Sequence, residues 1–224
     1  MLKNLKKFLF ILILFISLSL FSCSFFFGYQ IEGTKWQGQF LWVKMILEFQ
    51  ANGVVKTGSI ELIYNTVSRN QGTYTFDKSS MTGTITIDGN IEPFSINEKT
   101  NVLTLSSAGL TISFSDVTKS FSWPKVDASG CNYLGYFNNS NNDEIKVEVS
   151  FSTKTSGNIR FTNTQTNETS SYTFTATWDD ETYSGKIYYG SDNMDYQISI
   201  DKKYCVLDFI FQITRYTVIC NRFV

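Results

Sequence analysis

The chain contains no histidine among its 224 residues. Histidine is the commonest general base near neutral pH and a frequent ligand of zinc and copper, so its absence argues against the usual catalytic triads and most sites for these metals. The sequence also has no glycine-rich phosphate loop, no nucleophile elbow and no Cys-x-x-Cys pair. We therefore expect a protein that is not an enzyme and that uses no metal or cofactor.

Charged residues are also few, at 17% of the chain, and the lysines and arginines that follow the first 22 residues are scattered, with Lys202-Lys203 the one adjacent pair. A groove that binds a phosphate backbone needs clustered cations, so the sequence predicts no nucleic-acid partner. Prolines number only two, aromatic residues make up 16%, and Ser, Thr and Asn fill most polar positions. This composition is typical of an all-β protein.

Apolar and polar residues alternate from residue 36 onward, and no stretch keeps the three-to-four spacing of a helix. In residues 145–151, Ile, Val, Val and Phe alternate with Lys, Glu and Ser, so one face of this strand would be buried. Residues 172–178 repeat the pattern. Further strands are expected at 45–49, 74–76, 84–87, 94–96, 102–105, 111–114, 159–161, 186–189, 196–200, 205–210 and 211–218, with turns at 52–53, 88–89, 156–158 and 190–193.

The most specific feature lies at the start of the chain, where three lysines precede an apolar run at residues 8–21, which is followed by Ser22 and Cys23. The basic start would stay in the cytoplasm while the apolar run enters the bilayer, as in an export signal. Leu20, Ser22 and Cys23 resemble the cleavage box of bacterial lipoproteins, although Phe21 is bulkier than the usual residue. Relaxed boxes of this kind look like those of spirochaete lipoproteins.

This resemblance implies that residues 1–22 are a signal peptide, that Cys23 carries diacylglycerol and N-acyl chains, and that residues 23–30 form a tether. Two or three such chains hold a protein durably in a membrane. Ser24, in place of an aspartate, favours the outer membrane of the cell envelope, with periplasmic and surface-exposed placement both open. The alternative is an uncleaved transmembrane helix over residues 8–27, which are long enough to cross a bilayer.

Sliding the second half of the sequence over the first reveals an internal repeat. Residues 36–40 correspond to 133–137, and the offset then drifts in one direction from 97 to 104, as small loop insertions would produce. We therefore expect two copies of one β unit, the alternative being that any two antiparallel sheets share such short triplets. The other matches pair 74–76 with 172–174, Gly83 with Gly185, 94–96 with 196–198 and Leu103 with Leu207.

The repeat divides the mature chain into β domains at residues 31–117 and 131–224, joined by a linker at 118–130. The linker contains Pro124 and ends in the turn sequence Asp-Ala-Ser-Gly. Trp123, also in the linker, is too apolar to remain free in water. We expect it to pack between the two domains.

Each domain begins with an aromatic-x-Gly sequence followed by several hairpins, and so resembles the small lipocalin-like domains of bacterial lipoproteins. In that family the aromatic residue closes the floor of the barrel and the glycine lets two strands cross closely. Trp36 with Gly38 and Tyr133 with Gly135 occupy these places. The resemblance implies a small antiparallel barrel or sandwich, and it leaves open whether either domain holds a cavity.

Three cysteines remain besides Cys23, namely Cys131, Cys205 and Cys220. In an exported protein one intramolecular bridge could form among them. Cys131 and Cys220 lie at the two ends of the second domain, where first and last strands often meet, so we expect this pair to be bridged and Cys205 to be a free core thiol. The alternative is three unpaired buried thiols.

Two groups of carboxylates could support glycoside hydrolysis: Asp179, Asp180 and Glu181, or Asp143 and Glu144. Both groups lie in expected turns. A catalytic acid needs a desolvated pocket that raises its pKa, so solvated turns are the simpler interpretation.

Calcium could bind at residues 138–144 or 192–195, although neither has the spaced ligands of a specific loop. Asp208 interrupts an apolar strand, and we expect it to face outward and to pair with Arg215. Five tyrosines could line a ligand cleft or form a contact surface, with ordinary packing as the simpler interpretation: Tyr183, Tyr188, Tyr189, Tyr196 and Tyr204.

The sequence thus predicts an exported, membrane-anchored lipoprotein without enzymatic activity, in which a lipocalin-like domain binds a small apolar ligand. This hypothesis requires an enclosed apolar cavity, on the order of several hundred cubic ångströms. The alternative is a surface protein that contacts host or envelope macromolecules through exposed aromatic and Asn/Ser-rich loops. That function would require a contiguous exposed aromatic patch.

Overall fold

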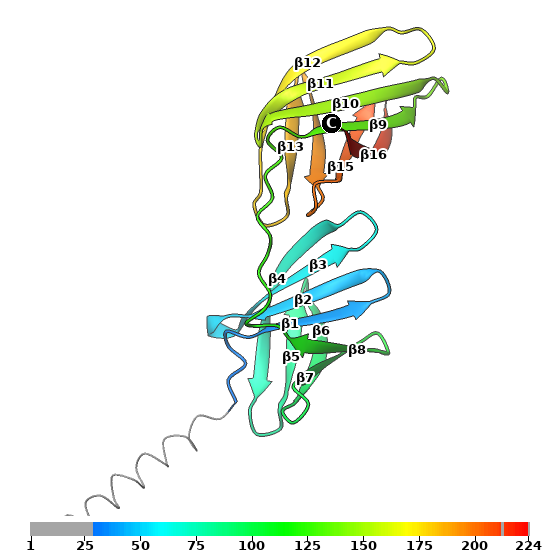
Figure 1. Ribbon diagram of the computed structural model, residues 1–224. Coiled ribbons are helices and arrows are strands. Elements are labelled where there is room, and N and C mark those ends of the chain that lie inside the picture. Colours follow the sequence, from blue (N-terminus) through cyan, green and yellow to red (C-terminus); the bar gives the residue numbers. More distant parts are fainter. Residues whose placement is uncertain (1–28, 212, 224) are drawn as a thin grey trace, which may run out of the picture.

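The computed structural model describes residues 29–211 and 213–223, which form two β-barrels connected by one extended segment (Figure 1). Each barrel is a closed antiparallel sheet of eight strands, in which sequence neighbours pair and the last strand returns to the first. The prediction of an all-β protein with two tandem units is therefore confirmed, and both units are closed barrels.

The first barrel, in chain order, consists of β1 (Lys35–Phe40), β2 (Val43–Phe49), β3 (Val54–Glu61), β4 (Thr66–Asp77), β5 (Thr82–Ile87), β6 (Asn90–Asn97), β7 (Val102–Ser107) and β8 (Leu110–Asp116), with a short 3-10 turn, η1 (Ala51–Gly53), between β2 and β3. The second barrel consists of β9 (Asn132–Asn138), β10 (Glu144–Thr153), β11 (Ser156–Asn163), β12 (Thr169–Ala176), β13 (Ser184–Tyr189), β14 (Asp192–Ile198), β15 (Tyr204–Phe211) and β16 (Thr214–Phe223).

Because each barrel is a meander, its turns alternate between two ends. We call the end that holds the first, third, fifth and seventh turns the mouth, and the opposite end, where the chain enters, the base. The mouth of the first barrel comprises the turns at 41–42, 62–65, 88–89 and 108–109. The mouth of the second barrel comprises the turns at 139–143, 164–168 and 190–191 and the connection between β15 and β16.

The predicted alternation of buried and solvent-facing residues is clearest in β10. Ile145, Val147, Val149 and Phe151 are all buried, whereas Glu144 and the end of the strand are exposed. Successive side chains of a strand point to opposite faces of the sheet, so a closed barrel gathers one set in its interior. The core of each barrel is built from these inward rows.

The internal repeat is confirmed strand by strand. Every pair of segments matched in the sequence lies on equivalent strands, which are β1 and β9, β4 and β12, β5 and β13, β6 and β14, and β7 and β15. Backbone hydrogen bonds repeat as well: the amide of Ile96 donates to Met81 O and that of Ile198 donates to Tyr183 O, both at 2.8 Å. Met81 and Tyr183 both have positive φ, at 55° and 57°.

The aromatic-x-Gly segments lie where the first and last strands of each barrel meet. Trp36 and Tyr133 are fully buried. A Cβ on Gly38 would lie 2.9 Å from the ring of Phe114, and one on Gly135 would lie 2.6 Å from Cys220 Sγ. Only glycine lets the two strands approach this closely without displacing a neighbour.

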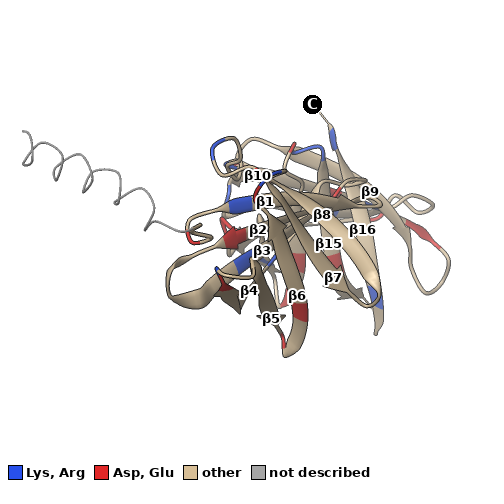
Figure 2. Ribbon diagram, turned by 90° about the horizontal axis from the view of Figure 1, so that it is seen from below, with Lys and Arg blue, Asp and Glu red and all other residues tan. Residues whose placement is uncertain are grey.

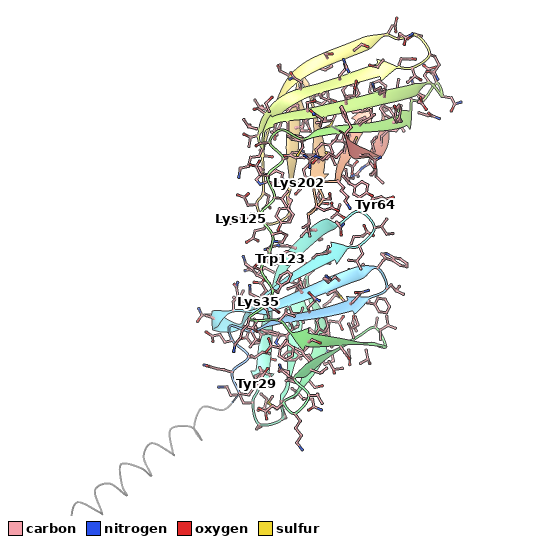
Figure 3. All side chains as sticks on the ribbon, viewed as in Figure 1. Tyr29, Lys35, Tyr64, Trp123, Lys125 and Lys202 are labelled. Atoms are coloured by element: carbon pink, nitrogen blue, oxygen red, sulfur yellow. The ribbon has the colours of Figure 1, made fainter. Side chains whose placement is uncertain are left out.

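Trp123 packs between the barrels, as predicted (Figure 3). Its indole lies over Gly58 of β3, where an added Cβ would be 2.5 Å from the ring. The Arg69 guanidinium stacks on the indole at 3.8 Å, and the indole N–H donates to Glu48 Oε1 at 2.5 Å. The linker thereby fixes its tryptophan to the outer wall of the first barrel.

The base of the second barrel rests on the β3–β4 hairpin of the first barrel, including its mouth turn at 62–65. The amide of Ile200 donates to Asn65 O at 3.0 Å, the Gln197 side chain donates to Val67 O, and the rings of Tyr64 and Tyr204 meet edge to face at 5.5 Å. Ile60, Val67 and Val126 belong to the same buried cluster as the core of the second barrel. Apolar packing and hydrogen bonds together join the barrels into one unit.

Several strand boundaries differ from the predictions. Residues 156–158 were expected to form a turn but begin β11, because Gly157 lies where any side chain would collide with Ser150 O and the ring of Phe174. The expected strand at 211–218 is wrong at its start, since β15 continues to Phe211 and β16 begins at Thr214. β3, rich in Lys, Thr, Gly and Ser, was not predicted because its alternation is weak.

Candidate ligand-binding site

The mouth of the second barrel contains a pocket of about 630 Å³. This volume is within the range of small-molecule sites. Strand register shows that eight of its lining residues point into the barrel, namely Ile145, Phe161, Asn163, Ser170, Tyr172, Tyr189, Asp192 and Phe211, while Asn139, Glu168, Thr169 and Ile210 complete the rim.

Three aromatic rings from neighbouring strands form one wall of the pocket. Tyr189 of β13 lies 5.9 Å from Phe161 of β11 and 5.5 Å from Tyr172 of β12, measured between ring centroids. Tyr189 is buried, whereas Tyr172 is 40% exposed at the opening. The wall therefore presents ring faces and edges to a molecule that enters from solvent.

A second group of rings packs beside the pocket around Phe137, which pairs with Ile145 near the mouth. Phe137 contacts Phe209 at 5.3 Å, Phe211 at 5.9 Å and Tyr216 at 4.7 Å. Further down, Ile159, Ile187 and Leu207 are fully buried and fill the middle of the barrel. The pocket is therefore confined to the mouth half, and the base half is a packed core.

Two of the turns at the mouth are held by asparagine side chains. Asn139 Oδ1 accepts hydrogen bonds from the amides of Asn141 and Asp143, both at 2.9 Å, and Asn163 Oδ1 accepts from the amide of Gln165 at 2.9 Å. Asparagine stabilises such turns by substituting its side chain for a backbone carbonyl. The polar rim is therefore locally ordered before any ligand binds.

Two carboxylates lie at the opening, Glu168 after the turn between β11 and β12 and Asp192 at the start of β14. Within residues 29–211 and 213–223, neither side chain has a hydrogen-bond or ion-pair partner. Burial, followed by the charge of Asp192, raises the pKa of Tyr189 to about 12. Tyr189 therefore stays protonated near neutral pH and keeps an O–H donor in the pocket.

This pocket differs from the expected cavity, which was enclosed and apolar. It opens to solvent at the mouth, and its upper part carries Asn163, Ser170 and Asp192. The reason lies in the sequence of β11 and β12, whose inward rows change from apolar to polar residues toward the connecting turn.

The first barrel presents apolar side chains at its mouth instead of a pocket. Its large exposed hydrophobic residues all lie at or beside the four mouth turns: Phe40, Leu41, Trp42, Leu62, Ile63, Ile91 and Leu110. The amide of Leu62 donates to Trp42 O at 2.8 Å, so the tips of the β1–β2 and β3–β4 hairpins lie side by side. A shallow hollow of about 640 Å³ on the outer wall of this barrel is lined mainly by Thr and Ser of β4 to β7.

The five tyrosines proposed as a cluster are not brought together. Only Tyr189 lines the pocket, and Tyr188, the next residue, is on the outer face. Tyr183 and Tyr196 are buried toward the base, where their hydroxyls donate to Pro124 O at 2.6 Å and Thr177 O at 2.8 Å. Tyr204 packs on Tyr64 of the first barrel.

The prediction missed most residues of the pocket, including Phe161, Tyr172 and Phe211 as lining groups. Alternation in β11 and β12 could have indicated which of them point inward. The sequence could not show which end of the barrel is hollow, because that depends on how inward side chains from all eight strands pack against one another in the interior.

The carboxylates considered for glycoside hydrolysis lie in surface turns. Asp180 is bound by Lys154 at 3.2 Å and by the indole of Trp178 at 2.6 Å, and Glu181 is bound by Lys56 of the first barrel at 2.8 Å. Asp143 accepts from Asn139 and Glu144 from Thr164, both at 3.2 Å. Neither the pocket at the mouth of the second barrel nor the hollow on the first barrel is lined by any of these carboxylates.

The candidate calcium segments, residues 138–144 and 192–195, do not gather acidic ligands. In the described part of the chain, no three Asp, Glu, His or Cys side chains are close enough to hold a metal ion. The predicted pair of Asp208 and Arg215 is confirmed, with contacts of 2.8 Å and 2.5 Å between β15 and β16.

The three cysteines of the second barrel are free and buried, so the expected bridge between Cys131 and Cys220 is not formed. The reason is register: Cys220 lies directly opposite Cys205 in the β15 and β16 pair. Cys131 instead precedes β9, at the position that Thr34 occupies before β1. The two ends of this domain do meet as predicted, since β16 pairs with β9.

The proposed lipidation site at Cys23 and the cleavage position after Ser22 lie outside the described residues. Nowhere in residues 29–211 and 213–223 is there a helix with the length and hydropathy needed to span a bilayer.

No protein-family model matches this chain, and no curated protein sequence matches it. Among solved structures, the chain is similar to a porin-like protein from Bacteroides uniformis, with 11% identity, a TM-score of 0.19, and coverage of 85% of this chain and 96% of that one. At this identity and TM-score the similarity supports no functional argument.

Proposed function

We propose that this protein is an exported lipoprotein of the cell envelope whose second barrel, a lipocalin-like domain, binds a small molecule with a largely apolar body. The pocket of about 630 Å³ at the mouth of that barrel is the observation that carries this proposal. Apolar and aromatic side chains form much of its lining, and Asn163, Ser170 and Asp192 add polar groups. An apolar lining with a few polar groups is typical of small-molecule sites.

The anchoring part of the proposal rests on the sequence of residues 1–23. Acyl chains on Cys23 would hold the protein at a membrane, with the outer membrane favoured. Because the chain enters the first barrel at its base, the tether would attach there, at the end opposite the exposed hairpin tips.

Metabolic labelling with a radioactive fatty acid tests the anchor. Wild-type protein should carry the label, and Cys23→Ala should lose it while the chain remains exported. Label retained by Cys23→Ala would contradict the anchor assignment.

A pair of adjacent substitutions on β12 tests the pocket. Ser170 points into the mouth and Ser171 points to the outer wall, so Ser170→Trp should fill the site while Ser171→Trp leaves it open. Mass analysis of molecules that co-purify with residues 24–224 should find a ligand with the wild type and with Ser171→Trp, and none with Ser170→Trp. No ligand in any of the three would contradict the proposed function.

The mouth of the first barrel supports a second candidate function, contact with a host or envelope macromolecule. Leu41, Trp42 and Ile63 are 62%, 55% and 58% exposed, and hairpins that meet there place them in one patch. Exposed apolar patches of this kind mark interaction surfaces. Leu41→Ser with Ile63→Ser should reduce retention of labelled residues 24–224 on envelope preparations, whereas Tyr136→Ser, on the second barrel, should not.

A further inference from the structure

The charges around the pocket in the second barrel have one sign. Glu168 and Asp192 line the opening, and none of its lining residues in the described part of the chain is Lys or Arg. Asp143 and Glu144 lie beside the same opening, in and after the turn between β9 and β10. Basic and acidic positions are otherwise dispersed over both barrels (Figure 2), so the negative field at the mouth arises locally.

The nearest cations lie on the outer wall, where each has a carboxylate partner, although Lys186 and Arg215 share a surface hollow with Asp192. Lys146 and Arg160 both contact Glu148, at 3.1 Å and 2.5 Å. Lys186 contacts Asp195 at 3.4 Å and Arg215 contacts Asp208 at 2.5 Å. The alternation of β10, β11, β13 and β16 directs all four cations away from the interior.

The aromatic wall suits a positive group for a separate reason. The faces of Phe161, Tyr172 and Tyr189 carry the negative part of the ring quadrupole, which attracts cations within about 6 Å of a ring centroid. The two ring pairs, at 5.9 Å and 5.5 Å, place these faces next to one another below Asp192 and Glu168. A ligand with an anionic group would be repelled by the two unpaired carboxylates and would find no cationic side chain among the described lining residues.

Resting on the proposed function, we infer that the pocket selects a ligand with an apolar body and a cationic head, either an amine or a quaternary ammonium. The body packs against Ile145 and Phe211, and the head lies against the aromatic wall at Tyr172 and Tyr189, within reach of the two carboxylates.

Three probes with one alkyl chain and different heads test this selectivity: octyltrimethylammonium, octyl glucoside and octyl sulfate. Each is titrated calorimetrically into residues 24–224, which contain both barrels, below its micelle concentration. The ammonium should bind at least about tenfold more tightly than the sulfate, with the glucoside between them. Added salt should narrow this difference, because it screens charges at the opening.

Glu168→Gln with Asp192→Asn should weaken binding of the ammonium by about tenfold and leave that of the glucoside unchanged. Asp180→Asn is the matched control, since it removes one carboxylate at the base of the same barrel and should change neither affinity. Unchanged thermal unfolding of the free variants shows that they keep the fold.

The outcomes separate the two proposals. If all three heads bind with the same affinity, or the double variant binds the ammonium as well as the wild type, the inferred selectivity is wrong while the pocket remains a binding site. If none of the probes binds, and no molecule co-purifies with the wild type, the proposed function is wrong and the selectivity is overturned with it.

Discussion

At the scale of residues, the buried thiols of the second barrel are strongly altered by their surroundings. Cys205 and Cys220 lie opposite one another on β15 and β16 and are fully buried. Burial raises the pKa of Cys220 from 9.0 to about 12, and it raises the pKa of Cys205 as well. Both thiols therefore remain protonated in the folded protein across the ordinary pH range.

These shifts predict a loss of stability at alkaline pH. Between pH 9 and about 12 the Cys220 thiol ionises in the unfolded chain but not in the folded one, so the unfolded state is favoured as pH rises. The slope from this group is about 1.4 kcal/mol per pH unit once the unfolded thiol is fully ionised. Urea unfolding from pH 8 to 11 should show the decline, and Cys220→Ala should make it shallower, with the remainder due to Cys205. Equal slopes for both proteins would contradict the assigned cause.

At the scale of elements, the seam between first and last strands closes each barrel around a glycine. Thr34 and Cys131 occupy equivalent places before these seams, and the Trp36 indole donates to Thr34 Oγ1 at 2.8 Å. The second barrel uses Tyr133 instead, whose hydroxyl donates to Lys202 O at 3.3 Å. The same strand crossing is thus stabilised by different side chains in the two copies.

A Cβ at Gly135 would meet Cys220 Sγ at 2.6 Å and Val218 Cγ1 at 2.8 Å. Gly135→Ala should therefore destabilise the protein by about 1–3 kcal/mol, as overpacking of a core does. Adding Cys220→Ala removes one of the two colliding atoms, so the double variant should lose less than the sum of the single changes. Additive losses, measured by chemical unfolding, would show that the seam is not the origin of the effect.

Much of this element-scale organisation could be predicted from sequence. The matched pairs of Gly83 with Gly185 and Leu103 with Leu207 identified equivalent strands, because residues that pack at a barrel crossing tolerate few alternatives. Gly157 was wrongly assigned to a turn. Glycine is common both in turns and where two strands approach closely, and the sequence does not distinguish these two cases. The pocket was not predictable in position, because no local pattern indicates where a barrel interior is left unfilled.

At the scale of the whole molecule, Trp123 fixes the segment between the barrels to strands β3 and β4, on which the second barrel also rests. Trp123→Ala would remove the indole between Gly58 and Arg69 and the hydrogen bond to Glu48. We expect a loss of roughly 2–4 kcal/mol and faster proteolysis within residues 117–131. Trp178→Ala is the matched control, because Trp178 contacts Tyr196 within the second barrel. Equal proteolysis of both variants would contradict a joining role for Trp123.

The contact between barrels also determines how a bound molecule could exchange. The base of the second barrel is covered by β3, β4 and the linker, and its lower half is packed, so a ligand has one route in and out, through the mouth. Ile213, fully exposed beside that opening, is a position from which a bulky label would obstruct the route without replacing a residue that lines the pocket. Such a label should lower the association and dissociation rate constants of the ligand by the same factor, and leave its dissociation constant unchanged.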